Sequence, residues 1–348
     1  MSSDAQRLKA TQMLIVATAF WGLSFPATKA LEMSQRDLLP AANSWFIASL
    51  CVIYRFAAAA LVLSLLSPRS LTRFARLEIE QGLGLGLFGG CGILLQVDGM
   101  AYTPASTSAF LTQCYCLIIP LWIALRERRW PAKRILASCT MVIVGVAVLA
   151  RVDWRHARFG RGELETIAAS VIFTGQILWL ERPRYAANNV RHFSIVMFTV
   201  MALVCLPVAL LTTRQAGDWL LAYDSRAALG FLGILVFFCT FGGYLLMNHW
   251  QRHVTATQAG LIYCIEPVFA SAFALFLPAW FSRWSSIEYA NEKLTASLLI
   301  GGGLITAANV LIQLPSRAPA TVAVESAKET PVRREEPVAR RVDDAAAS

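Results

Sequence analysis

Residues 12–31 read QMLIVATAFWGLSFPATKAL, an apolar run that carries a helix-disrupting proline, Pro26, and a cation, Lys29, near its end. An α-helix needs about 20 apolar residues to cross the hydrocarbon core of a bilayer. The run is long enough for that crossing, and it does not end in the small-residue cleavage site of a signal peptide. We therefore predict a retained transmembrane helix that bends at Pro26, because proline removes one backbone hydrogen bond.

The composition of the whole chain is typical of a membrane protein. Of its 348 residues 56% are hydrophobic and only 15% are charged, whereas charged residues make up about 25% of a typical soluble protein. The net charge of +9 comes largely from basic residues that flank apolar blocks, which indicates a lipid bilayer and no nucleic acid as the partner. Helices satisfy their own backbone hydrogen bonds in lipid, so we expect an all-α integral membrane protein.

Ten apolar blocks are predicted to span the membrane, and short polar turns separate them. They cover residues 12–31, 43–66, 82–102, 104–125, 134–150, 164–181, 193–213, 227–248, 256–280 and 294–314. Lys and Arg are more numerous in the loops on the side of the termini, although the basic loop 151–161 lies on the other side. The positive-inside rule therefore predicts a multi-pass protein of the plasma (cell inner) membrane with cytoplasmic N- and C-termini.

A weak internal repeat relates the two halves of the chain. Residues 103–111 align with 254–262 through the positions of their small residues, which permit close helix packing. The repeat unit has five helices, and because five is odd the second copy must be inverted in the membrane, as in many secondary transporters. The predicted organisation is a cytoplasmic tail, a first five-helix repeat, a basic external linker, a second inverted repeat and a disordered cytoplasmic tail, at 1–11, 12–151, 152–163, 164–314 and 315–348.

Four ionisable residues lie within the predicted spans, namely Lys29, Arg55, Asp98 and Glu266. A charge in the bilayer is costly and normally faces a cavity or a partner. Arg55 and Glu266 are the most central, so they are the first candidates for a substrate site. Lys29 and Asp98 lie near span ends, where anchoring at the interface is an alternative. Glu266 has the alternative of a buried ion pair or a helix cap.

Further residues support a polar site near the midplane. Gln176 and Gln251 can both donate and accept hydrogen bonds, although interhelical bonds explain such amides as well. Trp21 is a candidate for the wall of a pocket. Pro26 and Pro267 are the expected helix kinks or gating points, because each leaves one carbonyl without its helical donor.

Motifs for other chemistries are absent from the sequence. It contains no P-loop, no Gly-x-Ser-x-Gly and no HExxH motif, so neither an ATP-driven motor nor a hydrolase is predicted. His249 and His253 are four residues apart, a spacing that permits metal binding, but no acid or cysteine nearby completes a site. We therefore expect no catalytic residues, no metal and no cofactor.

Several motifs resemble those of the EamA-type members of the drug/metabolite transporter superfamily. They are Trp21-Gly22-x-Ser24-Phe25…Lys29, Tyr102-Thr103-x-Ala105…Phe110-Leu111, Arg126-Glu127-Arg128, Gln251-Arg252…Thr255-Ala256…Ile265-Glu266-Pro267-Val268-Phe269-Ala270 and Glu292-Lys293-Leu294-Thr295. The resemblance covers about residues 12–314. It implies ten helices in two inverted repeats and ATP-independent export or exchange of small metabolites. Pro26 and the long segment 278–291, interpreted as an external amphipathic flap, depart from the pattern.

The sequence thus predicts a secondary transporter that moves a small solute, such as an amino acid, by alternating access. Glu266 is expected to bind a cationic group or take up a proton, and Arg55 to pair with it or bind an anionic group. The partners are a small-molecule solute, H⁺ as a candidate coupling ion, and the bilayer. The alternative is a membrane-embedded enzyme or flippase acting on lipid-linked substrates. A non-transporting receptor or assembly protein is a third class, which leaves the buried charges without a role.

Overall fold

The computed structural model describes residues 3–68, 74–126, 128, 130, 133–149 and 160–313, and every element in these ranges is helical. The predicted all-α architecture is therefore confirmed. The chain divides into a helical body, Met1–Gln313, and the segment Leu314–Ser348. The predicted tail 315–348 and most of the predicted linker 152–163 lie outside the described residues.

The first half of the body contains α1 (Ser3–Leu38), α2 (Ser44–Leu66), α3 (Arg76–Gly99), α4 (Ala105–Thr112), α5 (Tyr115–Arg126) and α6 (Lys133–Leu149). The second half contains α7 (Arg161–Leu180), η2 (Pro183–Tyr185), α8 (Val190–Thr212), α9 (Asp218–Leu221), α10 (Arg226–Ile234), the π-helical η3 (Leu235–Leu245), α11 (Leu246–Trp250), η4 (Gln251–His253), α12 (Ala256–Tyr263), α13 (Glu266–Ala274), α14 (Leu277–Ser285) and α15 (Ala296–Gln313).

Each of the ten predicted spans coincides with helical structure, but not all are long, unbroken apolar helices. By length and hydropathy, six helical stretches can cross a membrane: Ala5–Leu38, Ser44–Leu66, Arg76–Met100, Ala105–Arg126, Val190–Thr212 and Arg226–His253. Two shorter apolar stretches are Leu136–Gly145 and Ala296–Ala308. A multi-pass membrane protein follows from these helices, whereas the number of ten crossings stays a prediction.

The N-terminal region is helical. Residues 1–11 are predicted to be a cytoplasmic tail, and within them α1 begins at Ser3 and continues to Leu38. No proline or glycine interrupts residues 3–11, and the Gln6 side chain lies 3.3 Å from the Nδ1 atom of His253. The helix therefore extends beyond the apolar run because local propensity and a contact with the second half both favour it.

Two of the predicted spans are broken helices. The block 104–125 is divided into α4 and α5 at Gln113–Cys114, and the block 256–280 is divided into α12 and α13 at Cys264–Ile265, with α14 beginning at Leu277. The second break replaces the kink expected at Pro267. A proline fits the first turn of a new helix, where its missing donor is not needed. The first break has no proline beside it, and hydropathy does not reveal it.

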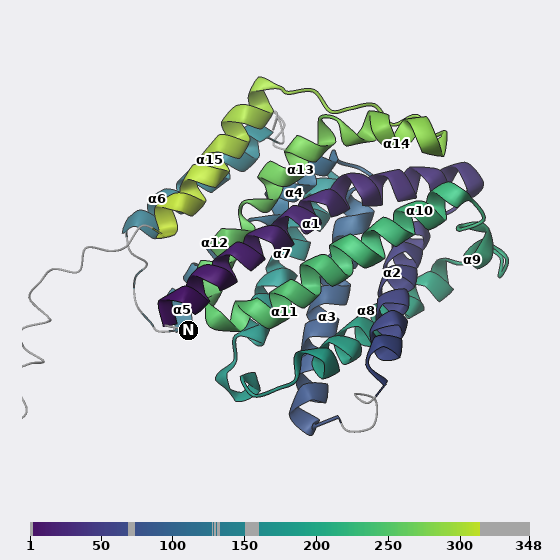
Figure 1. Cartoon of the computed structure of the whole chain (residues 1–348). Coiled ribbons are helices and arrows are strands. Elements are labelled where there is room, and N and C mark those ends of the chain that lie inside the picture. The colour runs from purple at the N-terminus through teal and green to yellow at the C-terminus, as the bar shows by residue number, and fades with distance from the viewer. Residues whose placement is uncertain are drawn as a thin grey trace, which may run out of the picture. The chain divides into compact units, whose positions relative to one another are not determined.

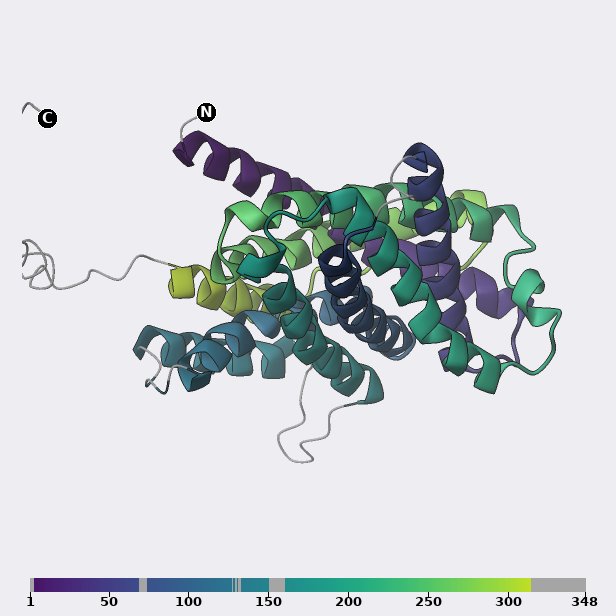
Figure 2. The same ribbon diagram turned by 90° about the horizontal axis from the view of Figure 1, so that it is seen from below.

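Helix α1 lies between elements of the second half. It packs against α10, η3, α11, α12 and α13, and Figure 1 shows it alongside α10 and α11. Gly22 permits the approach to α13, because an added Cβ would lie 2.6 Å from the Cβ of Phe269 and 2.9 Å from the backbone nitrogen of Ala270. Helices α6 and α15 form a separate pair at one side of the body, visible in Figures 1 and 2.

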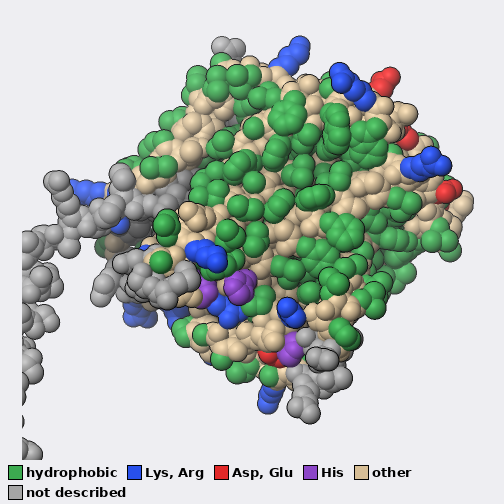
Figure 3. Space-filling view, viewed as in Figure 1, with side chains coloured by type: hydrophobic (Ala, Val, Ile, Leu, Met, Phe, Trp, Pro, Cys, Tyr) green, Lys and Arg blue, Asp and Glu red, His purple; other side chains and the backbone are tan. Residues whose placement is uncertain are grey.

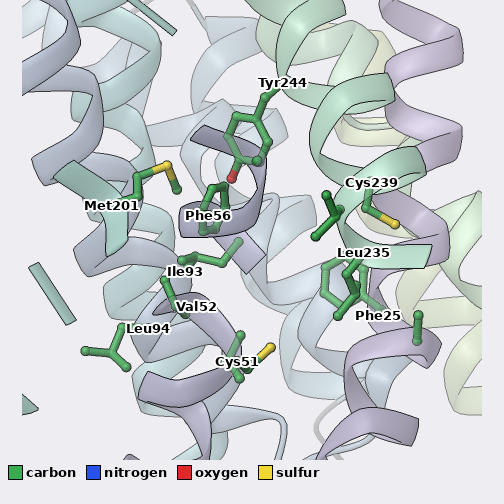
Figure 4. Packing of buried hydrophobic residues seen from close by; sticks show 14 of the residues in the cluster. Phe25, Cys51, Val52, Phe56, Ile93, Leu94, Met201, Leu235, Cys239 and Tyr244 are labelled. Carbon is green, nitrogen blue, oxygen red and sulfur yellow. The ribbon is translucent and has the colours of Figure 1, made fainter. Parts of the chain in front are cut away.

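The core lies where α1, α2, α3, α8 and η3 meet. Figure 4 shows Phe56 of α2 near Tyr244 of η3 and Met201 of α8. The rings of Phe56 and Tyr244 are 5.6 Å apart in an edge-on arrangement, which is favourable for aromatic pairs. This packing brings the middle of α2 and the middle of η3 together, and both contribute residues to the cavity described below.

The surface is hydrophobic to a degree that is unusual for a soluble protein. Figure 3 shows apolar side chains across most of one face, with charged side chains mainly toward its upper right and lower parts. Leu61, Leu211 and Phe237 are exposed by 60%, 87% and 59%. Such side chains are suited to contact with acyl chains, in agreement with a membrane-spanning body.

Candidate functional site

A cavity lies among the broken helices and the middle of α1, α2, α3, α7 and η3. It has about 520 Å³ of empty space, counting the part that is open to the outside. Its walls carry one cation and one carboxylate, Arg55 and Glu266, together with polar and aromatic side chains. The polar ones are Ser24, Gln96, Thr112 and Gln176, and the aromatic ones are Trp21, Tyr115, Phe173, Tyr244 and Tyr263.

Arg55 is a buried cation on α2. Its side chain is 2% exposed, its Nε atom donates to the hydroxyl of Thr240 at 2.8 Å, and its guanidinium lies 5.1 Å from the ring centre of Phe56. Thr240 belongs to the π-helical η3 and donates in turn to the carbonyl of Leu235 at 2.9 Å. Arg55 forms no ion pair with any carboxylate among the described residues, so its charge is available to a ligand in the cavity.

Glu266 is a buried carboxyl group at the first residue of α13. It is 6% exposed, and its Oε2 atom accepts a hydrogen bond from the amide of Gln113 at 3.1 Å. Gln113 lies at the break between α4 and α5, so the two broken helices meet at this bond. No Lys or Arg in the described part of the chain forms an ion pair with Glu266. Within the described residues, Glu266 therefore does not form the buried ion pair that was the alternative to a substrate site.

Aromatic rings form one side of the cavity. Trp21 contacts Tyr244 and Tyr263 edge-on, with ring centres 5.6 Å and 5.1 Å apart. The indole reaches this position because Gly243 has no side chain, since an added Cβ would lie 2.2 Å from the Nε1 atom of Trp21. That Nε1 atom is buried without a hydrogen-bond partner within the described protein. A polar group of a bound solute would satisfy it.

The two predicted glutamines lie at different distances from the cavity. Gln176 lines it and donates weakly to the carbonyl of Leu85, at 3.5 Å. Gln251 is not in the wall, but its Oε1 atom accepts a hydrogen bond from the hydroxyl of Tyr263 at 2.7 Å, and its Nε2 atom donates to the carbonyl of Ile177 at 3.3 Å. Gln251 therefore orients the wall residue Tyr263.

Lys29 and Asp98 have protein partners away from the cavity. The Nζ atom of Lys29 donates to the carbonyl of Met100 and lies 3.4 Å from the carboxylate of Glu32. Asp98 is fully buried and forms an ion pair with Arg161 at the start of α7. Each charge thus has an oppositely charged partner in the protein, and neither Lys29 nor Asp98 lines the cavity.

The two prolines predicted as kinks have different surroundings. Helix α1 runs through Pro26 without interruption, so the proline removes only the donor that would reach the carbonyl of Gly22. Pro267 lies in the first turn of α13, directly after Glu266. Neither proline is among the lining residues, but Pro267 directly follows the wall residue Glu266.

Several wall residues were not predicted from the sequence as site residues. Ser24, Thr112, Tyr244 and Met247 line the cavity, yet none is unusual in an apolar helix. Gln96 also lines the cavity, and its amide donates to the Thr112 hydroxyl at 2.8 Å. A sequence signal existed for Ser24, because it belongs to the quoted motif that begins at Trp21.

The described residues contain no group of three or more His, Cys, Asp or Glu side chains arranged to hold a metal ion. His249 and His253 lie with ring centres 6.3 Å apart beside Trp250. Among the described residues, the cavity offers hydrogen bonds and charges as its means of binding.

Comparisons with known proteins show what the chain is similar to. Residues 8–151 match the model of the EamA-like transporter family. An uncharacterized transporter of Archaeoglobus fulgidus is 22% identical over 315 residues, which cover 90% of this chain and 88% of the relative. An uncharacterized transporter of Haemophilus influenzae is 26% identical over 141 residues, 39% of this chain and 80% of the relative.

A solved structure described as "Crystal structure of protein" has a similar fold. Its TM-score is 0.52 at 18% sequence identity, and the match covers 92% of this chain and 99% of the other. At that identity the likeness concerns the fold alone.

Proposed function

We propose that the chain is an EamA-type secondary transporter for a small zwitterionic solute such as an amino acid, a proposal supported by the match of residues 8–151 to the EamA-like transporter family and by the similarity to an uncharacterized transporter over 90% of the chain. This similarity indicates a membrane protein that moves small solutes. The solute class, the absence of ATP coupling and the alternating-access mechanism are our proposal.

The observation that carries the proposal is the presence of two opposite charges in one cavity without an ion pair between them. Arg55 and Glu266 both line the cavity and are both buried. Buried charges in a membrane protein are expensive unless function requires them. A zwitterion provides a carboxylate for Arg55 and an ammonium for Glu266, and the charge-assisted bonds offset the loss of hydration on both sides.

Proton coupling follows as a second step of the proposal. Without a bound ammonium group, Glu266 is a buried carboxylate. Its side-chain hydrogen-bond partner among the described residues is the neutral amide of Gln113. Uptake of a proton removes that charge while the cavity is empty. Release of the proton on solute binding couples the movement of the proton to the movement of the solute, so a pH gradient can drive export or exchange.

Alternating access requires two parts that move relative to each other, and we propose that these are two inverted five-helix repeats with ten crossings. The position of the helix breaks supports this. Helices α4 and α12 both have eight residues and begin 151 residues apart, at Ala105 and Ala256. The helices that follow, α5 and α13, also begin 151 residues apart, at Tyr115 and Glu266.

The packing partners of these helices are reciprocal. Helix α1 contacts α12, α13 and η3, while α7, the first helix of the second half, contacts α4, α5 and α3. Likewise α4 contacts α13, while α12 contacts α5. Trp21 of α1 fits against Gly243 of η3, and Trp179 of α7 fits against Gly84 of α3. Exchange of partners between equivalent elements is what a two-fold relation of the halves predicts.

The proposed location is the plasma membrane, with both termini in the cytoplasm. The distribution of Lys and Arg in the loops supports this orientation. With this orientation, Asp98, Arg161 and Glu165 form a cluster at the outer ends of α3 and α7. The ion pair of Asp98 with Arg161 joins the two halves there.

The test uses purified protein in vesicles and solutes that each lack one charge. Wild-type uptake is first screened with the protein amino acids, and the one that is transported is then compared with its amide and its deaminated acid. Wild type is expected to prefer the zwitterion. Arg55→Gln is expected to lose the preference over the amide, and Glu266→Gln the preference over the deaminated acid.

The matched controls are charge removals outside the cavity. Arg36 pairs with Glu32, and the side chain of Glu80 is 38% exposed. Arg36→Gln, Glu80→Gln and Lys29→Gln are expected to retain both preferences. If Arg55→Gln and Glu266→Gln discriminate as the wild type does, the two residues do not bind the solute charges.

A further inference from the structure

Two cysteines meet where the broken helices of the two halves cross. Cys116 lies in the first turn of α5, and Cys264 lies in the break between α12 and α13. Their Sγ atoms are 2.8 Å apart. Both thiols also donate to one carbonyl oxygen, that of Gly260, at 2.9 Å and 3.0 Å. The pair is buried, with exposures of 7% and 3%.

The pair is adjacent to the proposed solute site. Tyr115 precedes Cys116, Glu266 follows Cys264 by two residues, and both Tyr115 and Glu266 line the cavity. Gln113, which donates to Glu266, also lies 4.0 Å from the Cys116 thiol through its Oε1 atom. The cysteines therefore connect α5 and the α12–α13 break at the level of the cavity.

We propose that Cys116 and Cys264 form a redox-modifiable pair, which a membrane-permeant two-electron oxidant of the azodicarboxamide class converts to a disulfide that joins the two halves and arrests transport. A disulfide bond is about 2.05 Å long, so the sulfurs need to approach by less than about 1 Å. The carbonyl oxygen of Gly260 accepts from both thiols and so holds the two sulfurs close together. This favours a disulfide between Cys116 and Cys264 over reaction with more distant thiols.

The reaction is balanced by the azo group. The two S–H bonds break and one S–S bond forms between Cys116 and Cys264. Two protons and two electrons pass to the N=N bond of the oxidant, which becomes a hydrazine. No other reactant is required, and a dithiol such as dithiothreitol reverses the modification by exchange.

Arrest of transport rests on the proposed function. In alternating access the cavity opens to one side and then to the other, so its walls must move relative to each other. A disulfide between residues 148 positions apart in the sequence fixes Tyr115 relative to Glu266. The cavity can then no longer change the side to which it opens.

The experiment treats the full-length protein in vesicles with diamide, an azodicarboxamide, and divides each sample. One part is digested with trypsin without reductant and analysed by mass spectrometry. Cleavage after Arg76, Arg126, Arg252 and Arg283 places Cys116 on the peptide 77–126 and Cys264 on the peptide 253–283. The first peptide also carries Cys91 and Cys114, so Cys116→Ser is needed to identify the sulfur involved.

We expect a mass for the two linked peptides in wild type that is lost after dithiothreitol, and lost in Cys116→Ser and in Cys264→Ser. Serine can still donate to the Gly260 carbonyl, so these variants retain that hydrogen bond. Cys239→Ser, which replaces a buried thiol of η3, is the matched control and is expected to form the linked peptides. Absence of the linked mass in wild type, or its persistence in Cys116→Ser, overturns the proposed pair.

The other part of each sample is used to measure solute flux. In wild type and Cys239→Ser the rate is expected to fall about tenfold after diamide and to recover after dithiothreitol, because the motion of the walls limits each cycle. In the two serine variants it is expected to stay unchanged. If the linked peptides form in wild type and its flux stays unchanged, the proposal that the disulfide arrests transport is overturned. If the untreated protein moves no solute the proposed function fails, while the linked mass still decides on the pair.

Discussion

The breaks in the two halves have the same backbone layout and different chemistry. In the first half, the residue after the break is Tyr115, and in the second half it is Glu266. Both side chains line the same cavity. The equivalent positions thus provide a neutral ring from one half and a carboxyl group from the other.

A second pair of helices shows the same difference. Helices α2 and α8 both have 23 residues and an asparagine cap, Asn43 and Asn189. Arg55 lies twelve residues after the first cap, and the residue twelve positions after the second cap is Met201. One half therefore contributes the cation of the cavity and the other the carboxyl group. In the inverted-repeat arrangement that we propose, corresponding helices of the two halves therefore carry different side chains, which suits a solute with two different ends.

The largest expected effect comes from removing this asymmetry. Replacing each charged residue by its counterpart gives Arg55→Met and Glu266→Tyr. Each is expected to lower solute flux at low concentration by about a hundredfold, because a hydrogen bond to a charged group contributes roughly 1.5–3 kcal/mol and about 1.4 kcal/mol corresponds to a factor of ten. The loss is measured as solute flux into vesicles that contain equal amounts of wild-type or variant protein. Glu80→Gln is the control, and near-normal flux in either variant would contradict an asymmetric site.

A smaller effect is expected at the two tryptophan–glycine contacts. An added Cβ lies 2.2 Å from Trp179 in Gly84→Ala and 2.2 Å from Trp21 in Gly243→Ala. Overpacking of this kind costs about 1–3 kcal/mol, so both variants are expected to unfold at lower temperature in detergent. Gly233→Ala, whose Cβ meets nothing within 4 Å, is the control and is expected to retain or raise stability.

The two glycine variants are also expected to differ in transport. Trp21 lines the cavity, whereas Trp179 contacts Arg182 and Tyr185 instead. Gly243→Ala is therefore expected to reduce flux of the folded protein more than Gly84→Ala does. Equal losses would indicate that the two contacts have the same role.

The smallest effect is expected at the helix caps. The side chains of Asn43 and Asn189 each accept a hydrogen bond at 2.9 Å, from the backbone nitrogens of Trp45 and Arg191. Asn43→Ala and Asn189→Ala are each expected to cost about 1 kcal/mol, while aspartate at either position retains the cap. Hydrogen exchange in the first turns of α2 and α8 measures this. A clearly unequal cost at the two caps would argue against equivalence of these helices.

The sequence identified the charged part of the candidate site because a charge within an apolar block is conspicuous. Arg55 and Glu266 are predicted from this signal, Gln176 from its amide and Trp21 from its aromatic ring, and the structure places all four around one cavity. Lys29 gave the same kind of signal, but its contacts with Met100 and Glu32 lie elsewhere. Hydropathy locates a residue along the membrane normal and contains no information on which neighbouring helix it faces.

Local sequence by itself determined that this is an all-helical, multi-pass membrane protein with motifs similar to those of EamA-type transporters, because apolar length, flanking charge and short motifs are properties of contiguous residues. Only the tertiary structure decided where α4 and α12 end, that Gln113 meets Glu266, and that Cys116 meets Cys264. These contacts join residues about 150 positions apart. Such contacts depend on how helices pack against one another, and each half provides only one side of them.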